Sequence, residues 1–114
     1  MENITLRLLI LKKIKIKIIM SKVINVITTK GCTGCRIQIE NLKQAIINSK
    51  KDIHLVITDF ADLTKNQIKA YRNNKVFLKD FPTTVFKNNE TITFKMVGST
   101  PTIVIQRYID LYMK

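Results

Sequence analysis

Residues 31–36 of the chain are Gly31-Cys32-Thr33-Gly34-Cys35-Arg36, and they contain both of its cysteines. The apolar run of residues 23–27 precedes them and is typical of a strand buried on both faces. Apolar side chains then recur at helical spacing, which predicts a helix reaching about Ser49 with one buried stripe formed by Cys35, Ile39, Leu42 and Ile46. The cysteines therefore lie where a predicted buried strand gives way to a predicted helix.

The spacing of the cysteines favours reversible dithiol chemistry. Two intervening residues place both sulfurs on the first helical turn, close enough to form a small disulfide. Unpaired backbone N–H groups and the positive end of the helix dipole stabilise a thiolate there relative to a thiol. Lys30 and Arg36 flank the pair and act in the same direction. Lowering a thiol pKa by one unit corresponds to about 1.4 kcal/mol in favour of the nucleophilic form.

Two other interpretations of the cysteine pair remain open. A buried structural thiol pair is one, although glycine and threonine neighbours offer little side chain to bury it. A zinc site is the other, because zinc sites reuse this spacing with four Cys or His ligands. His54 is the only further Cys or His in the chain, so carboxylates or a second subunit would have to complete the set. We predict no metal site.

Composition and charge fit one domain in a reducing compartment. The chain has 114 residues, 46% of them hydrophobic, and a formal charge of +12. Two cysteines without a secretory signal suit the cytoplasm. Residues 1–19 contribute +4 of the charge, and the remaining lysines are scattered without interleaved aromatic residues. We therefore expect a solvated basic surface and no nucleic-acid partner.

Residues 1–19 form an extension ahead of the predicted domain of residues 20–114. An apolar run at residues 8–11 precedes a strict alternation of Lys and Ile from Lys13 to Ile18, which favours a strand. The uncharged run is too short for a transmembrane helix, and its positive charges follow the apolar core, unlike those of a signal peptide. An edge strand, a surface-binding tail and a true start at Met20 all remain open.

Three strands and two helices are predicted after the first helix. Strands are expected at residues 53–58, 83–87 and 91–97, the last two joined by a turn at Asn88-Asn89-Glu90. Thr64 and Gln67 fit a capping box for a helix that ends near Asn73. The last helix is predicted with Thr100 as N-cap, Pro101 as first residue, and an inner face of Ile105, Tyr108, Ile109 and Tyr112.

The resulting order, β-α-β-α-β-β-α, resembles the thioredoxin-like superfamily over residues 22–113. Three separate features carry the resemblance: Cys32-Thr33-Gly34-Cys35 after a buried strand, the segment Phe81-Pro82-Thr83-Thr84-Val85-Phe86-Lys87-Asn88-Asn89-Glu90, and Lys95-Met96-Val97-Gly98 before the last helix. The resemblance implies an α/β fold with a central mixed four-stranded sheet flanked by helices.

The resemblance also implies roles for individual residues. Cys32 would be the attacking thiolate and Cys35 the resolving thiol. Phe81 and Pro82, joined by a cis bond, would lie opposite them. The implied substrate contacts are Gly31, Thr33, Gly34, Phe81, Pro82, Thr83 and Gly98.

The sequence departs from thioredoxins at three places. Gly31 stands where they usually have tryptophan, and Thr33-Gly34 replaces their Gly-Pro as well as the Pro-Tyr common in glutaredoxins. Val26 occupies the place of their buried acid. Removal of the Cys35 proton therefore has no obvious protein base.

The residues and the resemblance together predict a small dithiol-disulfide oxidoreductase that reduces protein disulfides. We expect a monomer with no bound cofactor, which depends on an external reductant, either a flavoprotein reductase or glutathione. The alternative is a non-catalytic accessory module with a thioredoxin-like fold and a basic surface.

Overall fold

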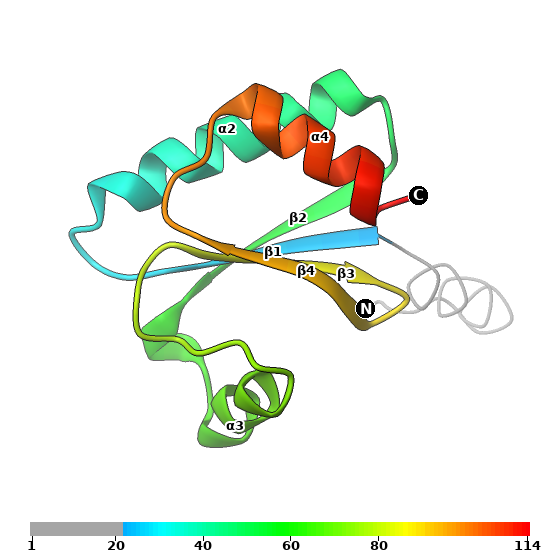
Figure 1. Cartoon of the computed structure of the whole chain (residues 1–114). Coiled ribbons are helices and arrows are strands. Elements are labelled where there is room, and N and C mark those ends of the chain that lie inside the picture. Colours follow the sequence, from blue (N-terminus) through cyan, green and yellow to red (C-terminus); the bar gives the residue numbers. More distant parts are fainter. Residues whose placement is uncertain (1–21) are drawn as a thin grey trace, which may run out of the picture.

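Four strands form one mixed sheet in the computed structural model, which describes residues 22–114 (Figure 1). They are β1 (Lys22–Thr28), β2 (Ile53–Asp59), β3 (Thr83–Asn88) and β4 (Thr91–Val97). The sheet order is β2-β1-β3-β4. Strand β1 is parallel to β2 and antiparallel to β3, which in turn is antiparallel to β4. The predicted mixed four-stranded sheet is confirmed.

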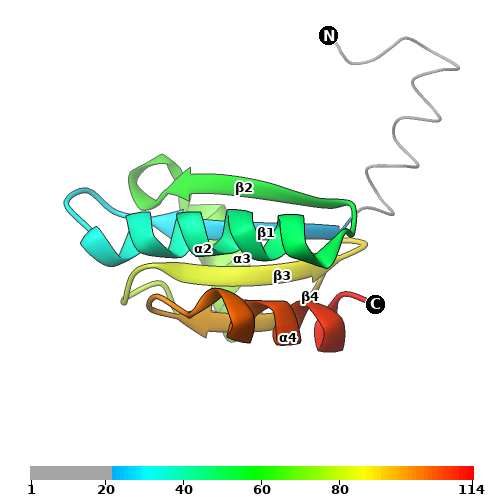
Figure 2. The same cartoon turned by 90° about the horizontal axis from the view of Figure 1, so that it is seen from above.

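Helices cover both faces of this sheet. They are α2 (Thr33–Ser49), α3 (Lys65–Asn73) and α4 (Thr102–Tyr112), with one turn of 3₁₀ helix, η1 (Phe60–Asp62). Figures 1 and 2 show α2 and α4 side by side over one face and α3 on the opposite face. The predicted element order is confirmed, and η1 is an addition to it. The predicted extension of residues 1–19 lies outside the described residues.

The core consists of one apolar cluster on each face of the sheet, and β1 contributes to both. Ile24 and Val26 are fully buried in the cluster beneath α2 and α4, while Ile27 is fully buried in the cluster on the α3 side. Complete burial of such a side chain contributes about 1.5–3 kcal/mol. The nearly continuous apolar run of β1 is therefore explained by burial on both faces.

Helix α2 buries a different set of residues from the predicted stripe. The buried residues are Cys35, Gln38, Leu42 and Ala45. Ile39 and Ile46 are only partly buried at the margin of the cluster. The prediction missed Gln38 because hydropathy does not identify a buried amide whose hydrogen bonds are satisfied within the protein.

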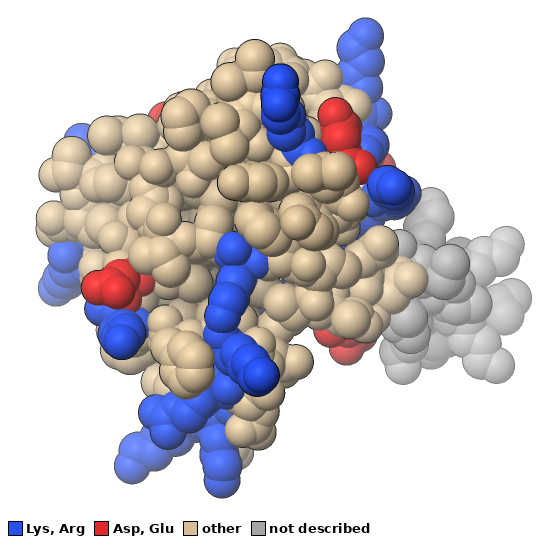
Figure 3. All heavy atoms as spheres, in the orientation of Figure 1, with Lys and Arg blue, Asp and Glu red and all other residues tan. Residues whose placement is uncertain are grey.

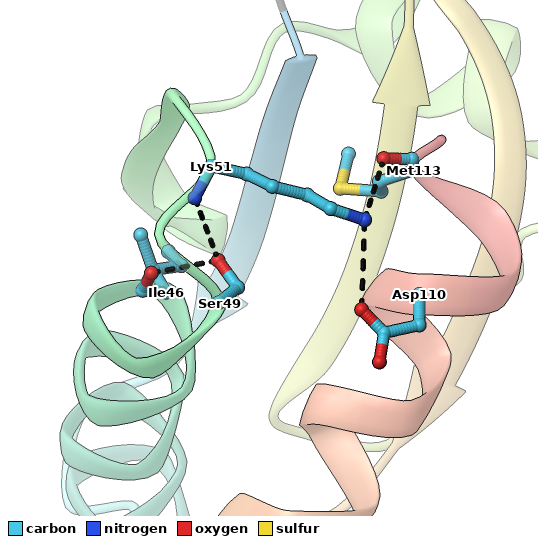
Figure 4. Close-up of polar contacts among 5 residues, drawn as sticks. All are labelled: Ile46, Ser49, Lys51, Asp110 and Met113. Carbon is cyan, nitrogen blue, oxygen red and sulfur yellow. Dashed lines mark hydrogen bonds and ion pairs between the residues drawn. The ribbon is translucent and has the colours of Figure 1, made fainter.

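The C-terminal end of α2 is connected to the end of α4 through Lys51 (Figure 4). The Lys51 ammonium donates to the Met113 carbonyl at 3.4 Å and lies 3.5 Å from a carboxylate oxygen of Asp110. The Lys51 backbone N–H donates to Ser49 Oγ, whose hydroxyl donates to the Ile46 carbonyl. These contacts connect the ends of α2 and α4 at the end of the molecule remote from the cysteines.

Two predicted helix starts have different outcomes. The capping box of Thr64 and Gln67 is confirmed at the start of α3. The predicted start of α4 is wrong by one residue, because Pro101 is the N-cap and Thr102 begins the helix. Thr100 does not cap it, since its N–H donates to Gln38 Oε1 and its hydroxyl contacts the Met96 sulfur. Among residues 22–114, no helix has the length and hydropathy needed to cross a membrane.

Candidate redox site

The cysteine pair lies at the junction of β1 and α2. Cys32 is the N-cap of α2, and its sulfur accepts a hydrogen bond from the Cys35 backbone N–H at 3.0 Å. A disulfide joins the two residues, whose Cα atoms are 5.2 Å apart. The Cys32 sulfur is thus exposed to the N–H groups of the first helical turn, where a negative charge is stabilised.

The two sulfurs differ in accessibility. Cys35 is 4% exposed, whereas Cys32 is only partly buried. Both line an open hollow of ≈ 480 Å³ together with Thr28, Thr29 and other neighbours. A reactant can therefore approach Cys32 more readily than Cys35.

Two exposed cations flank the pair. Lys30 precedes it in the loop after β1, and Arg36 follows it on α2. Within residues 22–114, neither side chain forms an ion pair. Their charges consequently remain available to attract an anion or to stabilise a thiolate at this end of the helix.

Two glycines and a proline shape the backbone around the cysteines. Gly31 has φ +70°, which a residue with a side chain adopts only at a cost. Gly34 lies in the first turn of α2, and a Cβ added there would be 3.6 Å from Pro82 Cδ. Pro82 is therefore packed directly against the turn between the cysteines. The Phe81–Pro82 peptide bond is cis.

The predicted substrate contacts fall into two groups. Gly31, Thr33, Gly34 and Pro82 surround the cysteines, with Thr33 exposed and Pro82 buried. The side chains of Phe81 and Thr83 contact other residues. The Phe81 ring packs against Phe60 with centroids 5.3 Å apart, and the Thr83 hydroxyl donates to the Asp80 carbonyl at 2.7 Å.

Backbone groups beside Pro82 differ in availability. The Gly98 N–H donates to the Pro82 carbonyl at 2.8 Å, so it supports the cis-proline strand and is not free for a ligand. The backbone N–H and carbonyl of Phe81 form no hydrogen bond within residues 22–114. An extended peptide could pair with them next to the cysteines.

No protein-family model matches the sequence, and a comparison with curated proteins gives no match. Solved structures do match. A thioredoxin from Aeropyrum pernix has a TM-score of 0.60 at 24% identity over 87% of this chain and 81% of that protein. Chloroplastic thioredoxin z has a TM-score of 0.65 at 13% identity, with 90% and 88% covered. Thioredoxin-2, a component of the malaria parasite's protein secretion machinery, has a TM-score of 0.64 at 16% identity, with 80% and 82% covered. The chain has a thioredoxin-like fold.

Sequence reasoning missed a buried polar pair in this thioredoxin-like fold. Gln38 and Thr84 are both fully buried, and the Gln38 amide donates to the Thr84 hydroxyl at 3.0 Å. Gln38 Oε1 accepts from the Thr100 N–H at 2.7 Å. The available signal was its position one turn after Cys35 on the buried face. Gln38 thereby connects α2 to β3 and to the loop before α4.

The zinc interpretation requires further ligands beside the two cysteines. His54 is exposed on β2, the edge strand next to β1. In the part of the chain that the structure describes, no three His, Cys, Asp or Glu side chains come together to hold a metal ion.

Val26, at the strand position where thioredoxins have an acid, is fully buried and apolar.

Proposed function

We propose that the protein is a dithiol-disulfide oxidoreductase that reduces disulfides of protein substrates. The observation that carries the proposal is the cysteine pair at the start of α2, with Cys32 accessible, Cys35 buried and a disulfide between them. Pro82 packs against the turn that holds them. The thioredoxin-like fold supports the same function.

The proposed reaction is two successive thiol-disulfide exchanges. The Cys32 thiolate attacks one sulfur of the substrate disulfide, a bond forms between these two sulfurs, and the other substrate sulfur leaves as a thiolate. The Cys35 thiolate then attacks Cys32 Sγ and releases the second substrate thiolate. Two electrons have passed to the substrate, and the protein retains the Cys32–Cys35 disulfide.

The remaining parts of the proposal concern partners and surroundings. A substrate chain would pair with the free backbone groups of Phe81 while its sulfur reacts with Cys32. No bound cofactor is required, because an external flavoprotein reductase or glutathione would return the disulfide to the dithiol. We propose that the protein is a monomer. A reducing compartment such as the cytoplasm fits a cysteine pair whose disulfide is transient.

Reduction of insulin tests the proposal. We expect the wild-type protein to precipitate reduced insulin chains in the presence of dithiothreitol, and Cys32→Ser to abolish this activity because no nucleophile remains at the accessible position. Cys35→Ser should accumulate mixed disulfides that are visible by mass spectrometry. A non-catalytic accessory module predicts instead that wild type and Cys32→Ser behave alike, and that outcome would refute the oxidoreductase proposal.

Alkylation of the reduced protein tests the order of the two thiols. Cys32 lies at the helix start and is the more exposed, so we expect it to react with iodoacetamide at lower pH and faster than Cys35. Peptide mapping after timed alkylation measures both rates. Equal labelling, or faster labelling of Cys35, would contradict the assigned roles.

A further inference from the structure

A hollow of ≈ 310 Å³ lies beside the cis-proline strand and combines exposed apolar groups with positive charges. Its apolar lining consists of Val76, Phe77, Met96 and Val97, and its cations are Lys79 and Lys95. Asp80 is its one acidic residue. Phe77 and Val97 are 55% and 57% exposed, which is high for such large apolar side chains. Exposed apolar groups rimmed by polar residues are typical of an interaction surface.

The positive charge extends beyond this hollow. A second hollow of ≈ 180 Å³ shares Phe77 and Lys79 and adds Arg72 from α3. Figure 3 shows blue side chains gathered in the lower part of this face, where α3 lies in Figure 1. Within residues 22–114, Arg72, Lys75, Lys79 and Lys95 form no ion pair. Their charges are thus not neutralised by ion pairs among the described residues.

Lys95 contacts two other residues around the hollow. The Lys95 ammonium donates a hydrogen bond to the Lys75 carbonyl. It also lies 5.8 Å from the centroid of the Phe77 ring, within the range of a cation–π contact. These contacts connect β4 to the loop after α3.

The lining of the hollow is connected to the redox site through the residues around Pro82. Thr83 belongs to its lining and directly follows Pro82. Val97 pairs with Thr83 across the β3–β4 ladder, and the following residue, Gly98, donates its N–H to the Pro82 carbonyl. Pro82 in turn packs against Gly34, between the cysteines. A peptide bound at Phe81 and Cys32 would reach Phe77 and Val97 within a few residues of its cysteine.

We propose that this hollow docks an acidic segment of the protein substrate, an inference that rests on the proposed oxidoreductase function. An apolar side chain of the segment lies between Phe77 and Val97, and neighbouring carboxylates face Lys79 and Lys95. A polypeptide fits better than a nucleic acid, because Phe77 is the one aromatic residue in the lining of the hollow and successive bases have no row of rings to stack on.

Peptide disulfides of different charge test the proposal on the reduced full-length protein. The peptides share a leucine near the cysteine and carry glutamate, glutamine or lysine at the flanking positions. We expect the acidic peptide to be reduced faster than the neutral one by about fivefold or more at low salt, because opposite charges accelerate association. The difference should fade at roughly 0.5 M salt, where exposed charges are screened.

Two charge-reversal variants locate the effect. Lys79→Glu should lose the preference for the acidic peptide, and Lys79 is suitable because its side chain forms no hydrogen bond within residues 22–114. Arg107→Glu makes the same charge change at an exposed position of α4, on the opposite face of the sheet, and should keep the preference. The ratio of rates on acidic and neutral peptides is compared, so a general effect on the thiols cancels.

Binding is measured separately with a labelled acidic peptide that has serine in place of cysteine. Its fluorescence anisotropy should rise with wild type and Arg107→Glu but much less with Lys79→Glu. Equal rates on acidic and neutral peptides in wild type, or equal losses in both variants, would overturn the proposal. So would displacement of the peptide by a lower concentration of a single-stranded oligonucleotide, which would indicate a nucleic-acid surface. If even the small neutral hydroxyethyl disulfide is not reduced, the oxidoreductase function fails, while the anisotropy still decides the docking.

Discussion

Gly34 lies between the two cysteines, and we expect it to influence their reduction potential. Packing does not demand a glycine there, because a Cβ would be at ordinary van der Waals distance from Pro82. Glycine in a helix is less favourable than alanine by about 0.8–1.0 kcal/mol, so the first turn of α2 is more loosely held. We therefore expect the thiolate to be only modestly stabilised and the couple to remain reducing.

Gly34→Pro should raise the reduction potential. Proline restricts the turn as in thioredoxins, better-held N–H groups stabilise the reduced form, and each 1.4 kcal/mol of this stabilisation is about 30 mV. Equilibration with glutathione buffers measures the change. Gly34→Ala is the matched control, with a smaller shift in the same direction. An unchanged potential in Gly34→Pro, or a wild-type pair that stays reduced in strongly oxidising buffers, would refute this explanation.

The residues of the site differ in how far the sequence could predict their placement. Local patterns predict the placement of Cys32, Cys35 and Pro82. The start of a helix, and a strand that follows a proline, can both be recognised from adjacent residues in the sequence. The orientation of the Phe81 ring was not predicted, since it depends on Phe60, a residue twenty-one positions earlier. Lys95 and Phe77 also come from separate segments, and no spacing rule brings them together.

At the scale of the elements, Gln38 connects α2 to the sheet. Its amide donates to Thr84, and its carbonyl oxygen accepts from the N–H of Thr100 in the loop between β4 and α4. Gln38→Leu keeps a similar volume but leaves the Thr100 donor unsatisfied. We expect a loss of about 1–3 kcal/mol in the free energy of unfolding, measured by urea denaturation.

Gln44→Leu is the matched control for this prediction. Gln44 lies on the same helix and is exposed, and within residues 22–114 its side chain forms a hydrogen bond only to Asn48. Its replacement should change the free energy of unfolding by no more than about 0.5 kcal/mol. Similar losses in both variants would show that the buried hydrogen bonds of Gln38 contribute little to stability.

The two errors at the level of elements share a physical origin. Apolar periodicity predicts the existence of α2 but not its rotation, which depends on the polar partners that the sheet and α4 provide for Gln38. The start of α4 was predicted from the preference of threonine for the N-cap and of proline for the first helical position. In the structure, contacts with Gln38 and Met96 use the polar groups of Thr100, and the helix begins at Thr102, one residue later than predicted.

At the scale of the whole molecule, we expect residues 1–19 to be dispensable. Both apolar clusters and the redox site are built from residues 24–113. Removing residues 1–19 should therefore leave insulin reduction and the urea unfolding transition nearly unchanged. A shortened protein that does not unfold cooperatively would show that this segment is an integral part of the sheet.

The disulfide at the start of α2 closes a loop between residues only three positions apart. By loop-closure arithmetic, so short a ring restricts the unfolded chain by only about 2 kcal/mol. A folded domain typically has roughly 5–15 kcal/mol of stability, so breaking the ring should not unfold it. We therefore expect the oxidised and the reduced protein to have the same fold. A partner would then distinguish the oxidised from the reduced protein by the bonding of one accessible sulfur, and not by a change of conformation.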